Sequence, residues 1–414
     1  MKNFFRICSL LGFLLASVIF TFVCIGENRI PNQIEILENE EVNVGNIFAT
    51  DVLQKDMNIF FVEPKKDASS LKSEQFLVDV SLFHTIPVKS ASVIVNKRQY
   101  VVPSGDVFGV KIYAEGLMVV GMDSVATQQG TICPAKEAGI KIGDVLLSMN
   151  GKKVETVKDF SKALMENGER AEIELLRDKK KMKVTLYFAE SKTNHKKRAG
   201  LWVRDSTAGV GTLTFYDAQT GVFAGLGHAI CDSDTGKCMP FKSGKAVTTK
   251  IKGCYKGAPG VTGELCGVFQ NTVMGTLYGN CSNGVYGMLY KWNKTEQEIP
   301  VATRQEVKEG SAQIISTVDE TGPHYYDVEI KKVMDSSEND GKNLILEITD
   351  SRLISKTGGI VQGMSGSPIL QNGMLVGAVT HVFVNNALEG YGVFAETMLK
   401  QANEFQKDLP QKAS

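Results

Sequence analysis

The chain has 414 residues, and its 46 lysine and arginine residues balance its 46 aspartate and glutamate residues. A neutral chain without a basic stripe interleaved with aromatic residues is not expected to bind DNA or RNA. The length exceeds what one hydrophobic core usually serves, so the sequence predicts at least two domains.

The N-terminal segment, residues 1–26, predicts a membrane anchor. Lys2 and Arg6 precede a charge-free, mostly apolar run at residues 10–26, which approaches the length of a helix that crosses a bilayer. No small-residue cleavage site follows, which favours an uncleaved anchor over a removed signal peptide. Basic residues before the run place the N-terminus in the cytoplasm and the remaining chain outside it.

Residues 27–103 form an N-terminal extracytoplasmic region in which no motif indicates a function. Residues 104–190 then resemble a PDZ domain, because the segment 133–151 has its pattern of helix, turn and strand. Near the start of that domain, Phe108, Gly109 and Val110 resemble its hydrophobic-glycine-hydrophobic peptide-binding loop.

This resemblance implies a groove that binds a chain end. Gly109 would let backbone amides face a terminal carboxylate, while the adjoining strand edge accepts the peptide as an extra strand. Apolar residues at helical spacing over residues 157–165 predict the other wall of the groove. A PDZ domain that only orients a catalytic domain is the alternative.

After a basic linker at residues 191–199, residues 200–406 are rich in glycine and in short β-branched runs. Such closely spaced short strands predict a pair of β-barrels. The last helical pattern ends near residue 405, and residues 407–414 form a polar tail.

The run at residues 363–368 has the shape of a serine-peptidase nucleophile turn. Glycines on both sides of Ser365 permit a sharp bend, so that the amides of Gly363 and Ser365 can face one developing oxyanion. His228, at the end of a small apolar strand, is the candidate general base. Asp350, which follows an apolar strand, is the candidate third member. An ordinary surface turn is the alternative at this run.

Together these motifs resemble the stage IV sporulation protein B peptidases, which join a PDZ domain to a trypsin-like serine peptidase domain. Besides the PDZ pattern, the similarity rests on residues 200–211, 225–228, 359–368 and 377–382. It implies a triad of His228 as base, Asp350 as orienting carboxylate and Ser365 as nucleophile. The expected fold is mainly β with short helices: an α+β PDZ domain, then a chymotrypsin-like double β-barrel, behind one membrane segment.

The resemblance also implies a biological role. A membrane-anchored serine endopeptidase of spore formation would act in the space between the two membranes around the developing spore. Members of the family cut themselves and then a membrane-bound regulator of an intramembrane protease, which activates a late sporulation sigma factor. C-terminal peptides at the PDZ domain and the membrane are the other expected partners. A catalytically silent PDZ scaffold that assembles membrane proteins is the alternative, and it would not need Ser365.

Two further residues are alternatives at the catalytic site. His381 follows the strand after Ser365 and is a rival base, but His228 fits two barrels that each supply part of a triad. Cys231 lies close to His228 in the chain and is an alternative nucleophile, as in a cysteine peptidase. Residues three apart in a strand point to opposite faces, however, which makes activation of Cys231 by His228 awkward. Met364 stands where trypsin-like enzymes carry an aspartate, which argues against activation by a buried new N-terminus.

Six cysteines beyond the predicted anchor permit disulfide bonds outside the cytoplasm, with pairings left open. They are Cys133, Cys231, Cys238, Cys254, Cys266 and Cys281. No Cys-x-x-Cys pair and no Cys-His ligand spacing occurs, so neither a metal site nor another cofactor is expected.

Overall fold

The structure is a computed structural model that describes residues 2–30, 32–37, 60–64, 75–82, 85–258, 260–334 and 341–407. The chain divides into two compact units, residues 1–99 and residues 100–414. Apart from Lys407, the predicted polar tail at residues 407–414 lies outside the described residues.

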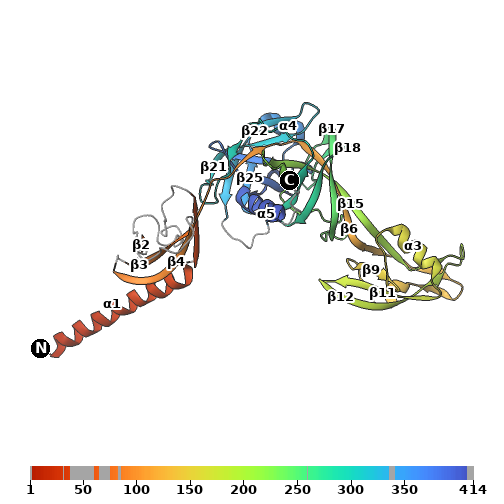
Figure 1. Ribbon diagram of the computed structural model, residues 1–414, viewed down its shortest axis with the longest axis horizontal. Coiled ribbons are helices and arrows are strands. Elements are labelled where there is room, and N and C mark those ends of the chain that lie inside the picture. Colours follow the sequence, from red (N-terminus) through yellow and green to blue (C-terminus); the bar gives the residue numbers. More distant parts are fainter. Residues whose placement is uncertain are drawn as a thin grey trace, which may run out of the picture. The chain divides into compact units, whose positions relative to one another are not determined.

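The first unit consists of one helix and a four-stranded sheet (Figure 1). In the sheet order β1-β4-β3-β2, β1 runs parallel to β4 and the other neighbours are antiparallel. Alternate side chains of β3 and β4, including Val78, Val80 and Val93, form its small core with Ile30. The elements are α1 (Lys2–Arg29), β1 (Gln33–Leu37), β2 (Phe60–Pro64), β3 (Gln75–Leu82) and β4 (Ile86–Asn96).

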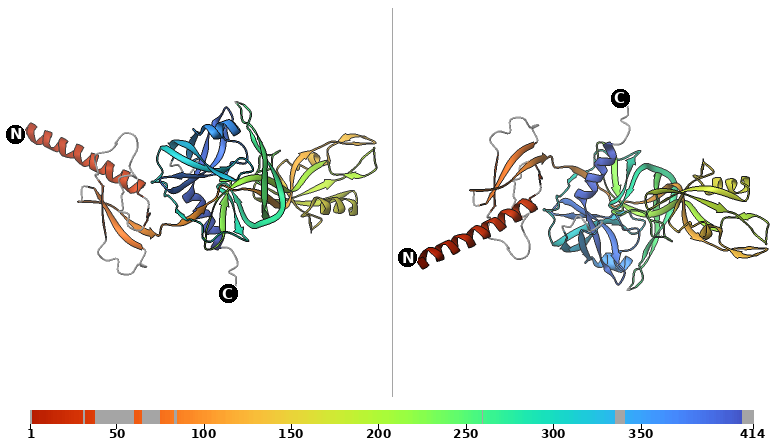
Figure 2. Two further views of the ribbon diagram at one scale, coloured as in Figure 1. Left: turned by 90° about the horizontal axis from the view of Figure 1, so that it is seen from above. Right: turned by 90° about the horizontal axis from the view of Figure 1, so that it is seen from below.

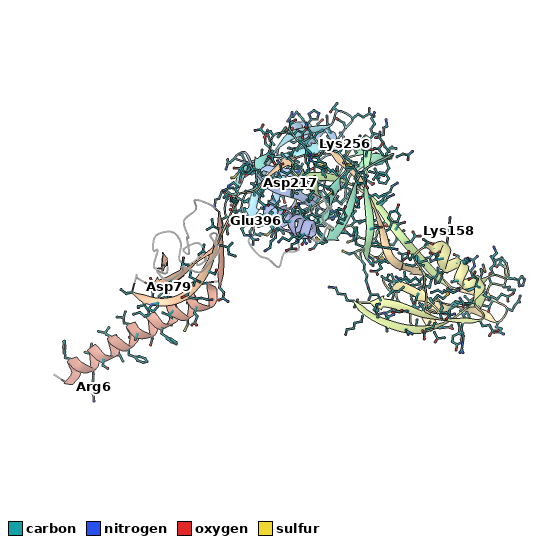
Figure 3. The ribbon with its side chains drawn as sticks, in the orientation of Figure 1. Arg6, Asp79, Lys158, Asp217, Lys256 and Glu396 are labelled. Atoms are coloured by element: carbon teal, nitrogen blue, oxygen red, sulfur yellow. The ribbon has the colours of Figure 1, made fainter. Side chains whose placement is uncertain are left out.

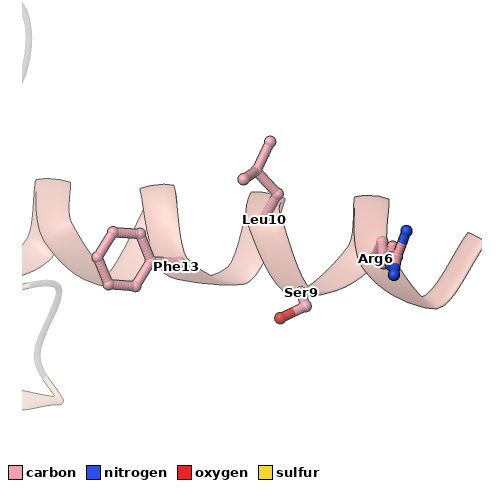
Figure 4. A pocket seen from close by; sticks show the side chains of 4 residues that line it. All are labelled: Arg6, Ser9, Leu10 and Phe13. Atoms are coloured by element: carbon pink, nitrogen blue, oxygen red, sulfur yellow. The ribbon is translucent and has the colours of Figure 1, made fainter. Parts of the chain in front are cut away.

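The membrane segment predicted at residues 1–26 falls on α1. Among the described residues, no helix combines the length and the apolar character needed to span a bilayer. A shallow hollow on α1 is lined by Arg6, Ser9, Leu10 and Phe13 (Figure 4). These four side chains come from one exposed helix, so nothing in the hollow indicates a catalytic site.

A ring of six strands opens the second unit, and we call it the N-terminal barrel. Its pairings run β6-β17-β18-β19-β16-β15 and return from β15 to β6. Phe108, Ile112, Phe223 and Val285 are fully buried in its core. The strands are β6 (Val107–Met122), β15 (Leu201–Tyr216), β16 (Val222–Gly225), β17 (Phe241–Tyr255), β18 (Glu264–Cys281) and β19 (Gly284–Leu289), and β5 (Tyr100–Pro103) pairs with β15.

The C-terminal barrel is closed in the order β21-β22-β23-β26-β25-β24. Its strands are coloured cyan to blue in Figure 2. Apolar side chains that alternate along its strands fill the interior, among them Ile314, Ile330, Leu346 and Ile369. Its elements are β21 (Gly310–Thr317), β22 (Pro323–Val333), β23 (Leu344–Ile348), α4 (Ser351–Thr357), β24 (Pro368–Gln371), β25 (Met374–Phe383), β26 (Asn386–Phe394) and α5 (Ala395–Lys407), and β20 (Ile299–Pro300) joins the two barrels.

The PDZ-like part is inserted into the N-terminal barrel instead of preceding it. Strands β6 and β15 continue beyond the barrel, and β9, β11 and β12 extend the sheet from β6 (Figure 1). The inserted elements are β7 (Val125–Thr127), β8 (Gly130–Ile132), α2 (Pro134–Glu137), β9 (Val145–Met149), β10 (Lys152–Lys153), α3 (Val157–Glu166), β11 (Arg170–Arg177), β12 (Lys180–Tyr187), β13 (Ala189–Glu190) and β14 (Lys197–Arg198).

The fold is therefore mainly β, as predicted, and contains the predicted pair of barrels. The predicted boundary at residue 104 differs from the structure, because β5 and the first half of β6 pair with barrel strands. The boundary at residue 200 differs as well, because the first half of β6, which lies before it in the chain, is a strand of the barrel. A peptidase domain limited to residues 200–406 would lack one strand of its own N-terminal barrel.

Candidate active site

Ser365 lies at a tight turn between α4 and β24. Gly363 and Gly366 hold φ angles of 98° and 97°, which glycine adopts without strain. A Cβ atom on Gly366 would overlap the carbonyl of Thr212. Within the described part of the chain, the amides of Gly363 and Ser365 donate no hydrogen bond. Two unpaired amides beside one hydroxyl are what an oxyanion hole requires.

Strand β15 of the N-terminal barrel supports this turn. The Thr212 amide donates to the Ser365 carbonyl at 2.8 Å, and the Thr212 hydroxyl donates to the Gly363 carbonyl at 2.8 Å. The Thr214 hydroxyl donates to the Gly366 carbonyl, also at 2.8 Å. Both threonines are fully buried. The nucleophile turn of one barrel is thus hydrogen-bonded to a strand of the other.

His228 follows β16 at a bend formed by Leu226 and Gly227, with φ angles of 65° and 70°. The Nδ1 atom of His228 lies 2.8 Å from the carbonyl of Ala229. Because a carbonyl only accepts, the proton sits on Nδ1 and leaves the lone pair on Nε2. Burial lowers the pKa of His228, so the neutral imidazole that a general base needs is favoured at neutral pH.

The base and the nucleophile come together around Thr380 of β25. The Ser365 hydroxyl donates to the Thr380 carbonyl at 2.6 Å. A Cβ atom on Gly227 would lie only 2.8 Å from the Thr380 methyl group. Within the described residues no hydrogen bond joins His228 to Ser365. The predicted pair is therefore brought to one site, with the hydroxyl directed to a backbone carbonyl.

Asp350 occupies a different place from the one predicted for a triad carboxylate. It is the N-cap of α4 and accepts from the amides of Arg352 and Leu353. The Arg352 guanidinium lies 2.6 Å from the same carboxylate and, as the main cause, holds the pKa of Asp350 at about 2. No hydrogen bond in the described part of the chain joins Asp350 to His228. The geometry does not support Asp350 as the orienting group, and its triad role stays a prediction.

His381, the rival base, makes a ring contact with His228. The two ring centroids are 4.7 Å apart, with an angle of 35° between the planes. Partial burial, followed by the charges of His228 and Lys342, lowers the pKa of His381 to about 4. A neutral ring packed against the base is suited to holding its orientation.

Phe108, Gly109 and Val110 do not line a peptide groove, and this prediction is wrong. They lie in β6, which pairs with β15 on one side and with β17 on the other, so no free strand edge remains there. Phe108 and Val110 are fully buried in the N-terminal barrel. A Cβ atom on Gly109 would lie 2.6 Å from the ring of Phe269. The glycine serves close packing of a barrel strand.

The predicted helical wall of the groove is α3, and it faces β15. Leu201 and Val203 of β15 pack on the same cluster as Phe160 and Leu164 of α3. Over residues 201–204, β15 pairs with β6 along one edge and has no second strand partner among the described residues. The apolar-glycine-apolar run at residues 199–201, with Gly200 at a φ of 68°, was the sequence signal for this edge.

Two of the six cysteines form a close pair beside the base. Cys231 and Cys238 are opposite each other in an antiparallel bridge, and their sulfur atoms are 3.4 Å apart. Both thiols are free. Among the described residues, no three His, Cys, Asp or Glu side chains gather in a way that would hold a metal ion.

Comparison with known families places this geometry in context. Residues 195–399 match SpoIVB peptidase S55, and residues 125–177 match a PDZ domain. The first match contains Ser365, His228 and the strands of both barrels except β6. The molecule is a serine peptidase that carries a PDZ domain. The chain belongs to the SpoIVB peptidase S55 family.

Other comparisons add less. No curated protein matches the chain at a significant level. The Rv3671c protease from M. tuberculosis in its active form is 11% identical, with 48% of this chain and 74% of that chain covered and a TM-score of 0.31. The HtrA-type protease AlgW with a decapeptide is 10% identical, with coverages of 52% and 58% and a TM-score of 0.31. Likenesses at this level support no inference about this chain.

Proposed function

We propose that the chain is an endopeptidase in which Ser365 attacks the peptide carbonyl and His228 acts as the general base. The turn itself is the observation that supports this proposal most directly. It holds a half-buried hydroxyl flanked by the unpaired amides of Gly363 and Ser365, beside a histidine whose Nε2 is unprotonated. A rotation of the Ser365 side chain from the Thr380 carbonyl toward His228 would complete the pair.

The chemistry then follows from these groups. His228 accepts the Ser365 proton as the oxygen adds to the carbonyl carbon, and the two amides stabilise the oxyanion. The imidazolium returns the proton to the leaving amine, which leaves an acyl group on Ser365. Water, deprotonated by His228, releases the acyl group and restores the hydroxyl.

The PDZ part would capture an extended peptide along the free edge of β15 at residues 201–204. Leu201 and Val203 provide an apolar floor shared with α3. The Val157 amide donates to the Asp205 carboxylate at 3.1 Å, which ties the start of α3 to the end of this edge. Peptide addition to a sheet edge is the mode that this arrangement suits.

The biological setting remains part of the proposal. We place the enzyme outside the cytoplasm at a membrane of the developing spore, where it cuts itself and a membrane-bound regulator of an intramembrane protease. The match to SpoIVB peptidase S55 is the support for this setting. A silent PDZ scaffold predicts no cleavage by the purified chain.

Replacement of Ser365 by alanine tests the activity. The full chain and a Ser365→Ala variant are purified, and self-cleavage and casein hydrolysis are followed with time. We expect the variant to fold and to lose cleavage almost entirely, with at most ~10³ to 10⁴ over the uncatalysed rate left. Ser367→Ala is the matched control, because the Ser367 hydroxyl is buried and bonds to Ser316. Equal cleavage by wild type and Ser365→Ala would exclude this nucleophile.

Peptide capture has a separate test. Val157 begins α3 and is 39% exposed, whereas Lys158 is a charged, exposed neighbour on the same helix (Figure 3). We expect Val157→Asp to weaken binding of a C-terminal peptide from the chain about tenfold by calorimetry, because a charge replaces the apolar surface that Val157 would offer to the bound peptide. Lys158→Asp should bind nearly as wild type does. Equal affinities in all three proteins would remove the β15 edge as the binding site.

A further inference from the structure

Lys342 lies next to the bend that carries the base, just before β23. A Cβ atom on its neighbour Gly341 would lie 3.4 Å from the Gly227 carbonyl, so the backbone here runs against that bend. On the other side, the Asn343 amide donates to the Gly392 carbonyl at 2.8 Å. The backbone at Lys342 is therefore fixed between the bend before His228 and strand β26.

The ammonium group of Lys342 lies among the side chains beside the base. Its Nζ atom is 5.2 Å from the centre of the Tyr391 ring, and that ring contacts Phe383 with 4.7 Å between centroids. After burial and the charge of His228, the charge of Lys342 is the next cause of the lowered pKa of His381. Because His381 contacts His228, the charge of Lys342 acts on a side chain that touches the base.

This ammonium group has no carboxylate partner within the described part of the chain. Lys342 is exposed, and the contact that the structure gives to its charge is the face of Tyr391. Other lysines of the same barrel differ, since Lys331 and Lys356 both pair with carboxylates. A contact between an exposed ammonium group and a ring is weak, so the charge of Lys342 remains available to a ligand.

The surroundings of the base suit a negatively charged group. No described carboxylate hydrogen-bonds to His228, and Asp350 is already paired with Arg352. Phe383 and Tyr391 are each half-buried and offer apolar surface beside the ammonium group. A positive charge next to apolar rings complements a side chain that has a few carbons and ends in a carboxylate.

We propose that Lys342 is a specificity-determining residue that binds an aspartate or glutamate side chain of the substrate close to the cleaved bond. This inference rests on the proposed function. An extended peptide advances about 3.3 Å per residue, so the acidic residue should lie within about four positions of the bond. The exposed stem of Lys342 lets its ammonium group meet the carboxylate while the backbone at residues 341–343 stays in place.

Digestion of a synthetic peptide library of random sequence tests this specificity, with mass spectrometry to locate the cleaved bonds. We expect wild type to favour Asp or Glu at one position within about four residues of the bond. For an acidic peptide and its glutamine counterpart, the ratio of kcat/KM values should fall about three- to fivefold in Lys342→Gln. Lys342→Glu should favour Lys or Arg at the same position. High salt should reduce the wild-type preference, because the pair is exposed.

Lys294→Glu is the matched control for the change of charge. Lys294 is exposed and lies over the ring of Trp292 at 5.3 Å, the same kind of contact that Lys342 makes. The Trp292 indole donates to the Ala218 carbonyl, which precedes β16, whereas His228 follows that strand. The control therefore lies toward the other end of β16, and its cleavage profile should match wild type.

Ser365→Ala is measured in parallel, so that the two proposals can fail separately. If wild type cleaves without an acidic preference, or Lys342→Glu keeps the wild-type preference, the inference is wrong and the proposed function stands. If Lys342→Gln and Lys342→Glu lose cleavage of all peptides equally, the residue supports the site without selecting substrates, and the inference is again wrong. Undiminished cleavage by Ser365→Ala overturns the proposed function itself.

Discussion

Replacing Gly109 by valine tests whether this part of β6 is a strand of the N-terminal barrel or a peptide-binding loop. The new Cβ atom would lie 2.6 Å from two carbons of the Phe269 ring and 2.7 Å from a methyl group of Val247. Ordinary carbon contacts need about 3.5 to 4.0 Å, so the ring and the β17 side chain must both move. Adding carbons to a packed core costs about 1–3 kcal/mol, and a β-branched side chain in a paired strand belongs at the upper end. We expect Gly109→Val to lose about 3 kcal/mol of unfolding free energy.

Urea denaturation followed by tryptophan fluorescence measures this loss, since Trp292 packs against the N-terminal barrel. Gly209→Val is the matched control. Gly209 lies in the neighbouring strand opposite Val110, and a Cβ atom there meets no atom within 4 Å. Its stability should stay within about 0.5 kcal/mol of wild type. A Gly109→Val protein with wild-type stability but lost affinity for C-terminal peptides would refute the barrel assignment and restore the peptide-binding loop.

Three further predictions concern Asp350, His228 and the cysteine pair. Asp350→Asn should keep the helix cap but lose the ion pair with the exposed Arg352, at a cost of about 1 kcal/mol in denaturation at pH 7. Activity of its folded form should fall less than about tenfold, whereas a defect near 10⁴ would return Asp350 to the triad. Because burial lowers the pKa of His228, kcat/KM should rise with pH through a midpoint below 6.5, and a midpoint above 6.5 would contradict the buried base. Oxidised glutathione should convert Cys231 and Cys238 into a disulfide by thiol exchange, raising stability by about 2.5 kcal/mol for so short a loop, and peptide mapping without reductant should show the cross-link. If a Cys231→Ser variant gained the same stability on treatment with oxidised glutathione, the pairing would be excluded.

The turn at Ser365 was predictable because it depends on a local pattern. Glycines at positions 363 and 366 adopt φ angles that other residues avoid. A few adjacent residues therefore determine a turn that exposes a hydroxyl. The start of α3 was predictable for the same reason, since apolar residues at helical spacing follow the cap residue Thr156. His228 was predicted as the base from its neighbours in the chain, whereas its placement relative to Ser365 depends on how the two barrels pack.

Tertiary structure alone decided the role of Phe108, Gly109 and Val110. An apolar-glycine-apolar run satisfies a peptide-binding loop and a crowded barrel strand equally well, and only the pairing with β15 and β17, about 100 and 140 residues away, distinguishes them. Asp350 is a similar case, because an aspartate after an apolar strand is both a possible catalytic carboxylate and a good helix cap. In the structure the carboxylate accepts from Arg352 and Leu353, which lie within three residues of it in the chain, and only the packing of the two barrels decides whether His228 reaches it.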